Sequence, residues 1–153
     1  VRQQQTDRLM LRNEAARGAT LVELAIVLAF LGVVTGIAVP RFLEVRDRVA
    51  ADAAATSAVA LLSTARHAAI RHARVTAVRF DSTTATITVF STTDTLERRS
   101  LAAVHGVIMS VTRDSIAYSP NGMGYGAANT RVILTRGAAA ETLTVSRLGR
   151  VRR

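Results

Sequence analysis

A run of 21 residues from Ala19 to Val39 contains a single charged side chain, Glu23, and is followed by Pro40. A helix rises about 1.5 Å per residue, so this run forms a helix about 30 Å long, which matches the hydrocarbon core of a bilayer. The segment before it is basic, with Arg2, Arg8, Arg12 and Arg17 against Asp7 and Glu14. The positive-inside rule therefore predicts a single span with its N-terminus in the cytoplasm and residues 41–153 exported.

The position of Gly18 separates this segment from a secretory signal peptide, which is cut after its apolar core at a small-residue site. Here the small residue precedes the core. Cleavage between Gly18 and Ala19 would remove only the charged leader, residues 1–18, and would leave the apolar helix on the mature protein. It would also create a new amine four residues from Glu23.

The sequence Gly18-Ala19-Thr20-Leu21-Val22-Glu23-Leu24 resembles the prepilin cleavage motif of type IV pilins and type II secretion pseudopilins. The resemblance implies cleavage after Gly18 by a prepilin peptidase, methylation of the Ala19 amine, and a helix bend at Pro40. Most family members have Phe or Met where this chain has Ala19. The resemblance also implies that Glu23 meets the N-terminal amine of a neighbouring subunit.

Physical chemistry also predicts a partner for Glu23, because an acid at the centre of a membrane helix costs about 2.5 to 3.5 kcal/mol on insertion scales. The alternative is an acid tolerated near the membrane interface, since Glu23 lies only four residues from Ala19.

Composition narrows the class of the exported part. All 20 basic residues of the chain are arginines, and removal of residues 1–18 leaves a net charge of +7, which favours an anionic partner. There is no cysteine, so a hydrophobic core and not disulfides must stabilise the 113 residues after Pro40. His67 and His72 are five apart and diverge on a helix, so no metal site is expected. No cofactor is expected either. No nucleophile motif is present, and we do not expect an enzyme.

Hydrophobic periodicity predicts an α+β fold for the exported part. Apolar residues recur every three or four positions, so an amphipathic helix with one face packed against a sheet is expected over 41–74, continuous with the helix of 19–40. The apolar positions are Phe42, Val45, Val49, Ala53, Leu62, Ala65 and Ala69. From 75 onward the period changes to that of strands. A hairpin is expected around Asp81-Ser82-Thr83, and further strands over 95–101, 106–112, 115–118, 131–135 and 142–146. The glycine-rich stretch 120–126 is expected to be a surface turn.

Later motifs resemble the GspH/FimT family of minor pilins and pseudopilins. They are Ala65-Arg66 with Ala69-Ile70, the stretch 116–122, and Leu143-Thr144-Val145-Ser146 leading to Gly149-Arg150-Val151. The resemblance implies a pilin-like fold, with a long N-terminal helix packed on an antiparallel β-sheet domain. It also implies assembly with other pilin or pseudopilin subunits from the inner membrane into a pilus or pseudopilus.

Four arginines, Arg147, Arg150, Arg152 and Arg153, lie in the last seven residues. Gly149-Arg150-Val151-Arg152 resembles the Gly-Arg-x-Arg tail of FimT-type pilins, which implies binding of double-stranded DNA during natural transformation. A flexible arginine tail suits phosphate contact, and Arg131 and Arg136 are candidates to extend the basic surface. Two alternatives remain: the arginines are solvated or pair with acids of a neighbouring subunit, and the protein is a GspH-like pseudopilin of a type II secretion system that binds no DNA.

Overall fold

The computed structural model describes residues 20–92, 94–125 and 129–153, and the chain divides into two compact units between Arg41 and Phe42. One helix, α2 (Leu21–Arg71), runs through both units for 51 residues and continues through Pro40. Thr20 caps its first turn, because the Thr20 Oγ1 accepts the amide hydrogen of Glu23 at 3.2 Å. The single long helix predicted from the sequence is therefore confirmed, whereas a bend at Pro40 stays a prediction.

The first unit contains the part of α2 that is suited to a membrane. An 18-residue window there has a mean hydropathy of 2.5, and none of its residues is buried against another part of the chain. Among the described residues, α2 is the only helix long and apolar enough to cross a bilayer. Length and composition thus allow a single-pass anchor.

The part of α2 in the second unit buries a face composed of small residues. Its fully buried positions begin at Ala51 and are mostly alanines, followed by Leu61 and Leu62. Alanine is the strongest helix former, and its short side chain lets the helix lie close to a sheet. The predicted buried stripe is confirmed at Leu62, Ala65 and Ala69. It was wrong at Phe42, Val45 and Val49, which are 69%, 58% and 62% exposed. The second sheet first reaches the helix at Asp47, through Arg136, and the fully buried helix positions begin at Ala51.

Helix α2 ends at Arg71, three residues before the predicted end. The reason lies in Ala73, which adopts a left-handed conformation with φ +48°. The amide of Arg74 then donates to the carbonyl of Ala69, in the pattern of a Schellman cap.

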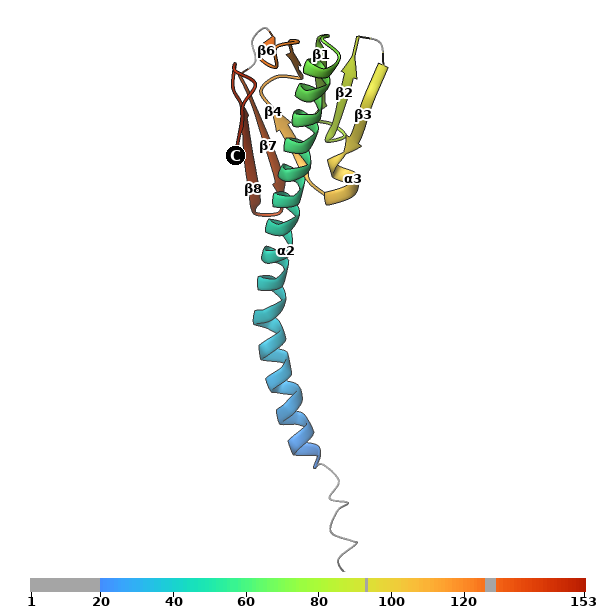
Figure 1. The fold of residues 1–153 in the computed structure, drawn as a ribbon. Coiled ribbons are helices and arrows are strands. Elements are labelled where there is room, and N and C mark those ends of the chain that lie inside the picture. Colours follow the sequence, from blue (N-terminus) through green and yellow to red (C-terminus); the bar gives the residue numbers. More distant parts are fainter. Residues whose placement is uncertain (1–19, 93, 126–128) are drawn as a thin grey trace, which may run out of the picture. The chain divides into compact units, whose positions relative to one another are not determined.

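Two antiparallel sheets follow the helix (Figure 1). The first sheet has the order β3-β2-β1-β5-β6, with β1 (Thr76–Asp81), β2 (Thr86–Ser91), β3 (Asp94–Ser100), β5 (Ser115–Tyr118) and β6 (Gly124–Tyr125). The second has the order β4-β7-β8-β9, with β4 (Ile108–Val111), β7 (Thr130–Arg136), β8 (Ala139–Val145) and β9 (Val151–Arg152). A short helix, α3 (Leu101–His105), joins β3 to β4.

Both sheets and α2 share one core. Buried side chains of the first sheet, such as Val78 and Ile87, belong to the same cluster as Leu134 and Leu143 of the second sheet and the helix alanines. Every buried apolar residue of this cluster lies between Ala54 and Val145. The second unit therefore contains a complete hydrophobic core, and the predicted α+β class is confirmed.

Most of these elements were predicted from the sequence, and three were not. The hairpin around Asp81 is β1 and β2, and the strand predicted over 115–118 has the same bounds in the structure. The missed elements are α3, β6 and β9. Leu101 begins α3 and does not end a strand, and Gly124–Tyr125, predicted as part of a turn, forms the short strand β6.

Candidate nucleic-acid interface

The C-terminal arginines lie on an ordered hairpin, and not on the flexible tail that the sequence suggested. The turn after β8 is closed by hydrogen bonds from the Ser146 amide to the Arg150 carbonyl at 2.8 Å and from the Gly149 amide to the Ser146 carbonyl at 2.9 Å. Gly149 has φ +72°, a conformation that glycine adopts without strain. The chain then returns as β9, in which Val151 pairs with Val145 and Arg152 with Thr144.

Strand alternation separates the last two arginines. Val151 lies opposite the buried Val145, so Arg152 lies on the outer face of the sheet, with Thr144. Arg153 instead pairs with two acids: its Nη2 with Asp52 of α2, and its Nε with the Glu141 Oε2 at 3.3 Å. Of the four C-terminal arginines, Arg153 is thus occupied within the chain.

The side chain of Arg136 is also paired within the chain. Its Nε donates to the Asp47 Oδ1 at 3.0 Å, and its Nη1 donates to the carbonyl oxygen of His105. The Arg136 and Asp47 side chains are only 22% and 24% exposed. Arg136 therefore ties β7 and the end of α3 to α2, and it does not extend the basic surface as the sequence analysis suggested.

Arg131 lies on the outer face of the second sheet, in line with Arg152. It pairs across β7 and β8 with Thr144, which in turn pairs with Arg152 across β8 and β9. Neighbouring strands are about 4.8 Å apart, so the two arginine backbones are about 10 Å apart with Thr144 between them. This distance lets two arginines contact separate phosphates.

A groove of about 730 Å³ lies beside this row. It is lined by Thr112, Arg113, Asn129, Thr130, Arg131 and Thr144. Asn129 joins the groove to the C-terminal turn, because its Oδ1 accepts the amide hydrogen of Arg147 at 3.1 Å. No acidic side chain lines the groove among the residues that the structure describes.

Arg113 was not among the site residues predicted from the sequence. It lies between β4 and β5, and no local pattern distinguishes it from other arginines in loops. The connection to β7 places it at the groove: the Thr112 amide donates to the Arg131 carbonyl, and the Arg131 amide donates to the Thr112 Oγ1 at 2.9 Å. Only the pairing of β4 with β7 could have revealed it.

We call the exposed set Arg113, Arg131, Arg147, Arg150 and Arg152 the arginine face. Within the described part of the chain, none of these five side chains makes an ion pair or a hydrogen bond. Guanidinium groups stay charged at any working pH and present a planar fork of donors to phosphate or carboxylate. The arginine face is therefore a surface of free positive charge.

The other residues singled out in the sequence lie near the N-terminus. Gly18 and Ala19 lie outside the described residues. Glu23 lies in the first turn of α2 and is exposed, and Pro40 lies inside the helix.

The fold is that of minor pilins and pseudopilins. The type IV minor pilin FimU of Pseudomonas aeruginosa has a similar structure, with a TM-score of 0.57 and 14% identity over 67% of this chain and 86% of that chain. The minor pseudopilin EpsH from the type 2 secretion system of Vibrio cholerae is also similar, with a TM-score of 0.55 and 16% identity over 67% of this chain and 94% of that chain. A search of curated proteins found no match.

Residues 54–149 match the family model described as type II transport protein GspH. The chain belongs to the GspH family, as the resemblance in its sequence indicated, and is a minor pilin or pseudopilin. Membership implies assembly with other pilin subunits.

Proposed function

We propose that this protein is a FimT-like minor pilin that binds double-stranded DNA through the arginine face during DNA uptake. The observation that carries the proposal is a groove lined by Arg113 and Arg131 and by no described acid, with three more arginines that form no ion pair on the adjoining C-terminal turn and strand, Arg147, Arg150 and Arg152. A surface of this kind suits a polyanion, because each guanidinium can contact a phosphate and release counterions. Arg153 and Arg136 do not contribute, since Asp52, Glu141 and Asp47 already neutralise them.

Duplex DNA suits the surface better than single-stranded DNA. Proteins that hold single strands stack the bases on aromatic side chains. None of the six residues that line the groove is aromatic. Contacts to the phosphate backbone need no such platform, so binding should be sequence-tolerant and strongly dependent on salt.

A direct test compares duplex binding by residues 42–153, which contain the complete core. The variant Arg147→Ala/Arg150→Ala removes two members of the arginine face, and Arg79→Ala/Arg98→Ala makes the same charge change on the first sheet. We expect roughly micromolar affinity at low salt for the wild type and for Arg79→Ala/Arg98→Ala. Arg147→Ala/Arg150→Ala should bind duplex DNA at least tenfold more weakly. Equal binding by all three proteins would contradict the proposal.

We further propose that the mature protein begins at Ala19, after a prepilin peptidase has removed residues 1–18 and the new amine has been methylated. The basic leader would remain in the cytoplasm and the second unit would lie in the periplasm. Mass spectrometry of the membrane protein should find methylated Ala19 as its first residue. A protein that keeps its leader would contradict this processing.

Glu23 would then meet the Ala19 amine of a neighbouring subunit during assembly. Glu23→Gln should leave the protein in the membrane but lower its incorporation into filaments at least tenfold, because the amide carries no charge to pair with the amine. Unchanged incorporation would contradict this role.

The second candidate is a minor pseudopilin of a type II secretion system that binds no DNA. The description of the matched family and the likeness to EpsH favour it. In this case the arginine face would pair with acids of a neighbouring subunit. Absence of duplex binding at low salt, with secretion lost on deletion of the gene, would make this the better account.

A further inference from the structure

A second surface, on the outer face of the first sheet, has a different character from the arginine face. Four apolar residues form a strip across β2, β1, β5 and β6: Phe90 pairs with Ala77, Ala77 with Ala117, and Ala117 with Tyr125. Their neighbours Val78, Val89 and Ile116 are buried in the core, so the four side chains lie on the outer face. We call Phe90, Ala77, Ala117 and Tyr125 the apolar strip.

The shape of the apolar strip suits one inserted side chain. Its two ends are aromatic and its two middle residues are alanines, so the middle is lower than the ends. Three strand spacings make it about 14 Å long. Tyr125 is 64% exposed and the other three are partly exposed. Contiguous apolar surface of this kind marks an interaction site more often than isolated apolar residues do.

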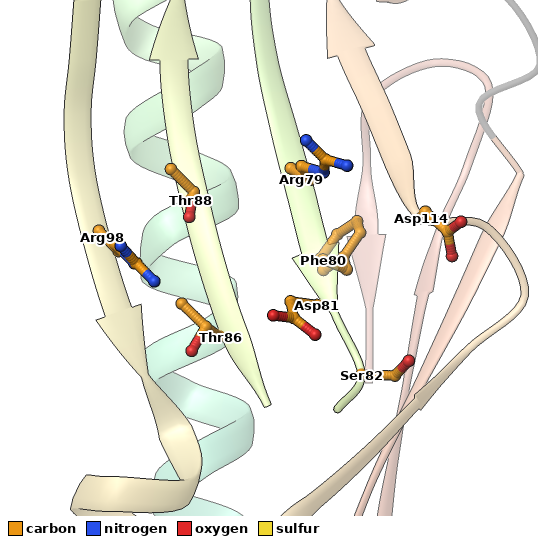
Figure 2. A pocket seen from close by; sticks show the side chains of 8 residues that line it. All are labelled: Arg79, Phe80, Asp81, Ser82, Thr86, Thr88, Arg98 and Asp114. Carbon is orange, nitrogen blue, oxygen red and sulfur yellow. The ribbon is translucent and has the colours of Figure 1, made fainter. Parts of the chain in front are cut away.

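Two arginines border the apolar strip. Arg79 lies two residues from Ala77 on β1, about 7 Å along the strand, and pairs across the sheet with Thr88, which in turn pairs with Arg98 of β3. Figure 2 shows Thr88 between the two arginines, on the wall of a cleft of about 500 Å³. Neither arginine side chain makes an ion pair or hydrogen bond within the described residues, whereas the adjacent Arg99 pairs with Glu97.

The same cleft contains two acids, Asp81 and Asp114 (Figure 2). The carboxylate of Asp81 accepts hydrogen bonds from the Thr84 hydroxyl at 2.8 Å and from the Thr83 amide at 3.0 Å. These hydrogen bonds lower the pKa of Asp81, and the bond from the Thr84 hydroxyl has the largest effect. Asp81 is therefore ionised at neutral pH. A run of phosphates would meet these negative charges, so the mixed cleft suits a single carboxylate of a protein better than DNA.

We propose that the outer face of the first sheet docks a neighbouring subunit of the filament. The docked segment places an apolar side chain on Ala77 and Ala117, between Phe90 and Tyr125, and a carboxylate between Arg79 and Arg98. The occupant follows from charge and shape: two guanidiniums that form no ion pair or hydrogen bond with the described residues lie beside an apolar strip whose residues are partly or fully exposed. The inference rests on membership of the pilin family and is independent of DNA binding.

Site-specific crosslinking of the full-length protein in the membranes of its own cells tests this surface. A photo-crosslinking amino acid is placed at position 77 in the apolar strip, and at position 142, exposed on the outer face of the second sheet, as the matched control. We expect a product at position 77 that contains a peptide of another pilin or pseudopilin subunit, with an Asp or Glu within a few residues of the crosslinked apolar residue. Position 142 should give no such product.

Charge reversal then tests the carboxylate contact. Arg79→Glu/Arg98→Glu should lower the yield of the product at least tenfold, and an arginine in place of the identified acid should restore it. Arg131→Glu/Arg152→Glu, the same change on the second sheet, should leave the yield unchanged. The proposal is overturned if position 77 gives no subunit product, if nuclease treatment abolishes the product, or if the first-sheet reversal has no effect on it.

Discussion

At the scale of single residues, the neighbours of an arginine decide what it does in this domain. Arg131 and Arg136 lie on the same strand, five residues apart. Arg136 contacts Asp47 and the carbonyl of His105, so its charge is used within the fold. Arg131 contacts no described acid and lines the groove. Count and spacing in the sequence do not distinguish the two.

This difference predicts opposite phenotypes for two alanine variants. Arg136→Ala should lower the free energy of unfolding by about 1 to 3 kcal/mol, because it leaves Asp47 and the His105 carbonyl without their donor, and should leave DNA affinity unchanged. Arg131→Ala should weaken DNA binding and leave stability within about 0.5 kcal/mol. Urea denaturation and duplex titration of both variants measure the two effects. Weaker DNA binding by Arg136→Ala, together with lower stability of Arg131→Ala, would contradict these roles.

Tyr118 provides a prediction on pH. Its hydroxyl is buried and has no hydrogen-bond partner among the described residues, and burial raises the pKa of Tyr118 to about 12. The unfolded chain would ionise near pH 10, so the contribution of this group is fully present below pH 10 and is lost as the pH rises towards about 12. By pH 11 the loss should reach about 1 kcal/mol.

Tyr118→Phe should remove this loss, because phenylalanine does not ionise. At pH 7 the variant should be at least as stable as the wild type, since the hydroxyl forms no bond. Urea denaturation at pH 7 and pH 11 measures both effects. An equal decrease in stability of the two proteins between these pH values would rule out Tyr118 as the cause.

At the scale of elements, the turn between β8 and β9 positions the C-terminal arginines. A Cβ atom on Gly149 would lie 2.7 Å from the carbonyl oxygen of Gly122 and 3.2 Å from the Tyr118 ring. Gly149→Ala should therefore cost about 1 to 3 kcal/mol and weaken DNA binding, although every arginine remains. Leu148→Ala, an exposed neighbour in the same turn, should change stability by less than about 0.5 kcal/mol. Equal effects of the two substitutions would contradict this role of Gly149.

Elements with strong periodicity were predictable from the sequence, and short or context-dependent ones were not. The 51-residue helix and the Asp81 hairpin follow from apolar spacing and turn residues. Helix α3 has only five residues, too few for a period, although Ser100 caps its start and Gly106, with φ +65°, ends it. Strand β9 has two residues, and its pairing with β8 depends on the turn at Gly149.

The helix face was misjudged for a related reason. Phe42, Val45 and Val49 have the spacing of a buried stripe, but spacing does not reveal how far the sheets extend along a helix. These residues are exposed in the single chain. Alanines from Ala51 onward form the buried face, although their hydrophobic signal is weak.

Only part of the arginine face could be predicted from the sequence. The cluster at the C-terminus identified Arg147, Arg150 and Arg152, but strand alternation and two acids distant in sequence set Arg153 apart. Arg113 joins the site only through the pairing of β4 with β7. Tertiary partners therefore decided which arginines are free.

At the scale of the whole molecule, the two sheets present different chemistry on their outer faces. The second sheet carries the arginine face, whose groove no described acid lines. The first sheet carries an apolar strip beside a cleft with two arginines and two acids. A subunit that bound DNA with one sheet could therefore contact its neighbour with the other, and variants on each sheet should affect one activity and not the other.

The most direct test of DNA binding by the arginine face is the salt dependence of duplex binding by residues 42–153. Each phosphate contact contributes about −0.9 to the slope of log affinity against log salt concentration, so five contacts give a slope of about −4.5. Arg150→Ala/Arg152→Ala should make the slope shallower by about two and weaken binding at every salt concentration. An unchanged slope, or no binding by the wild type at low salt, would contradict the account.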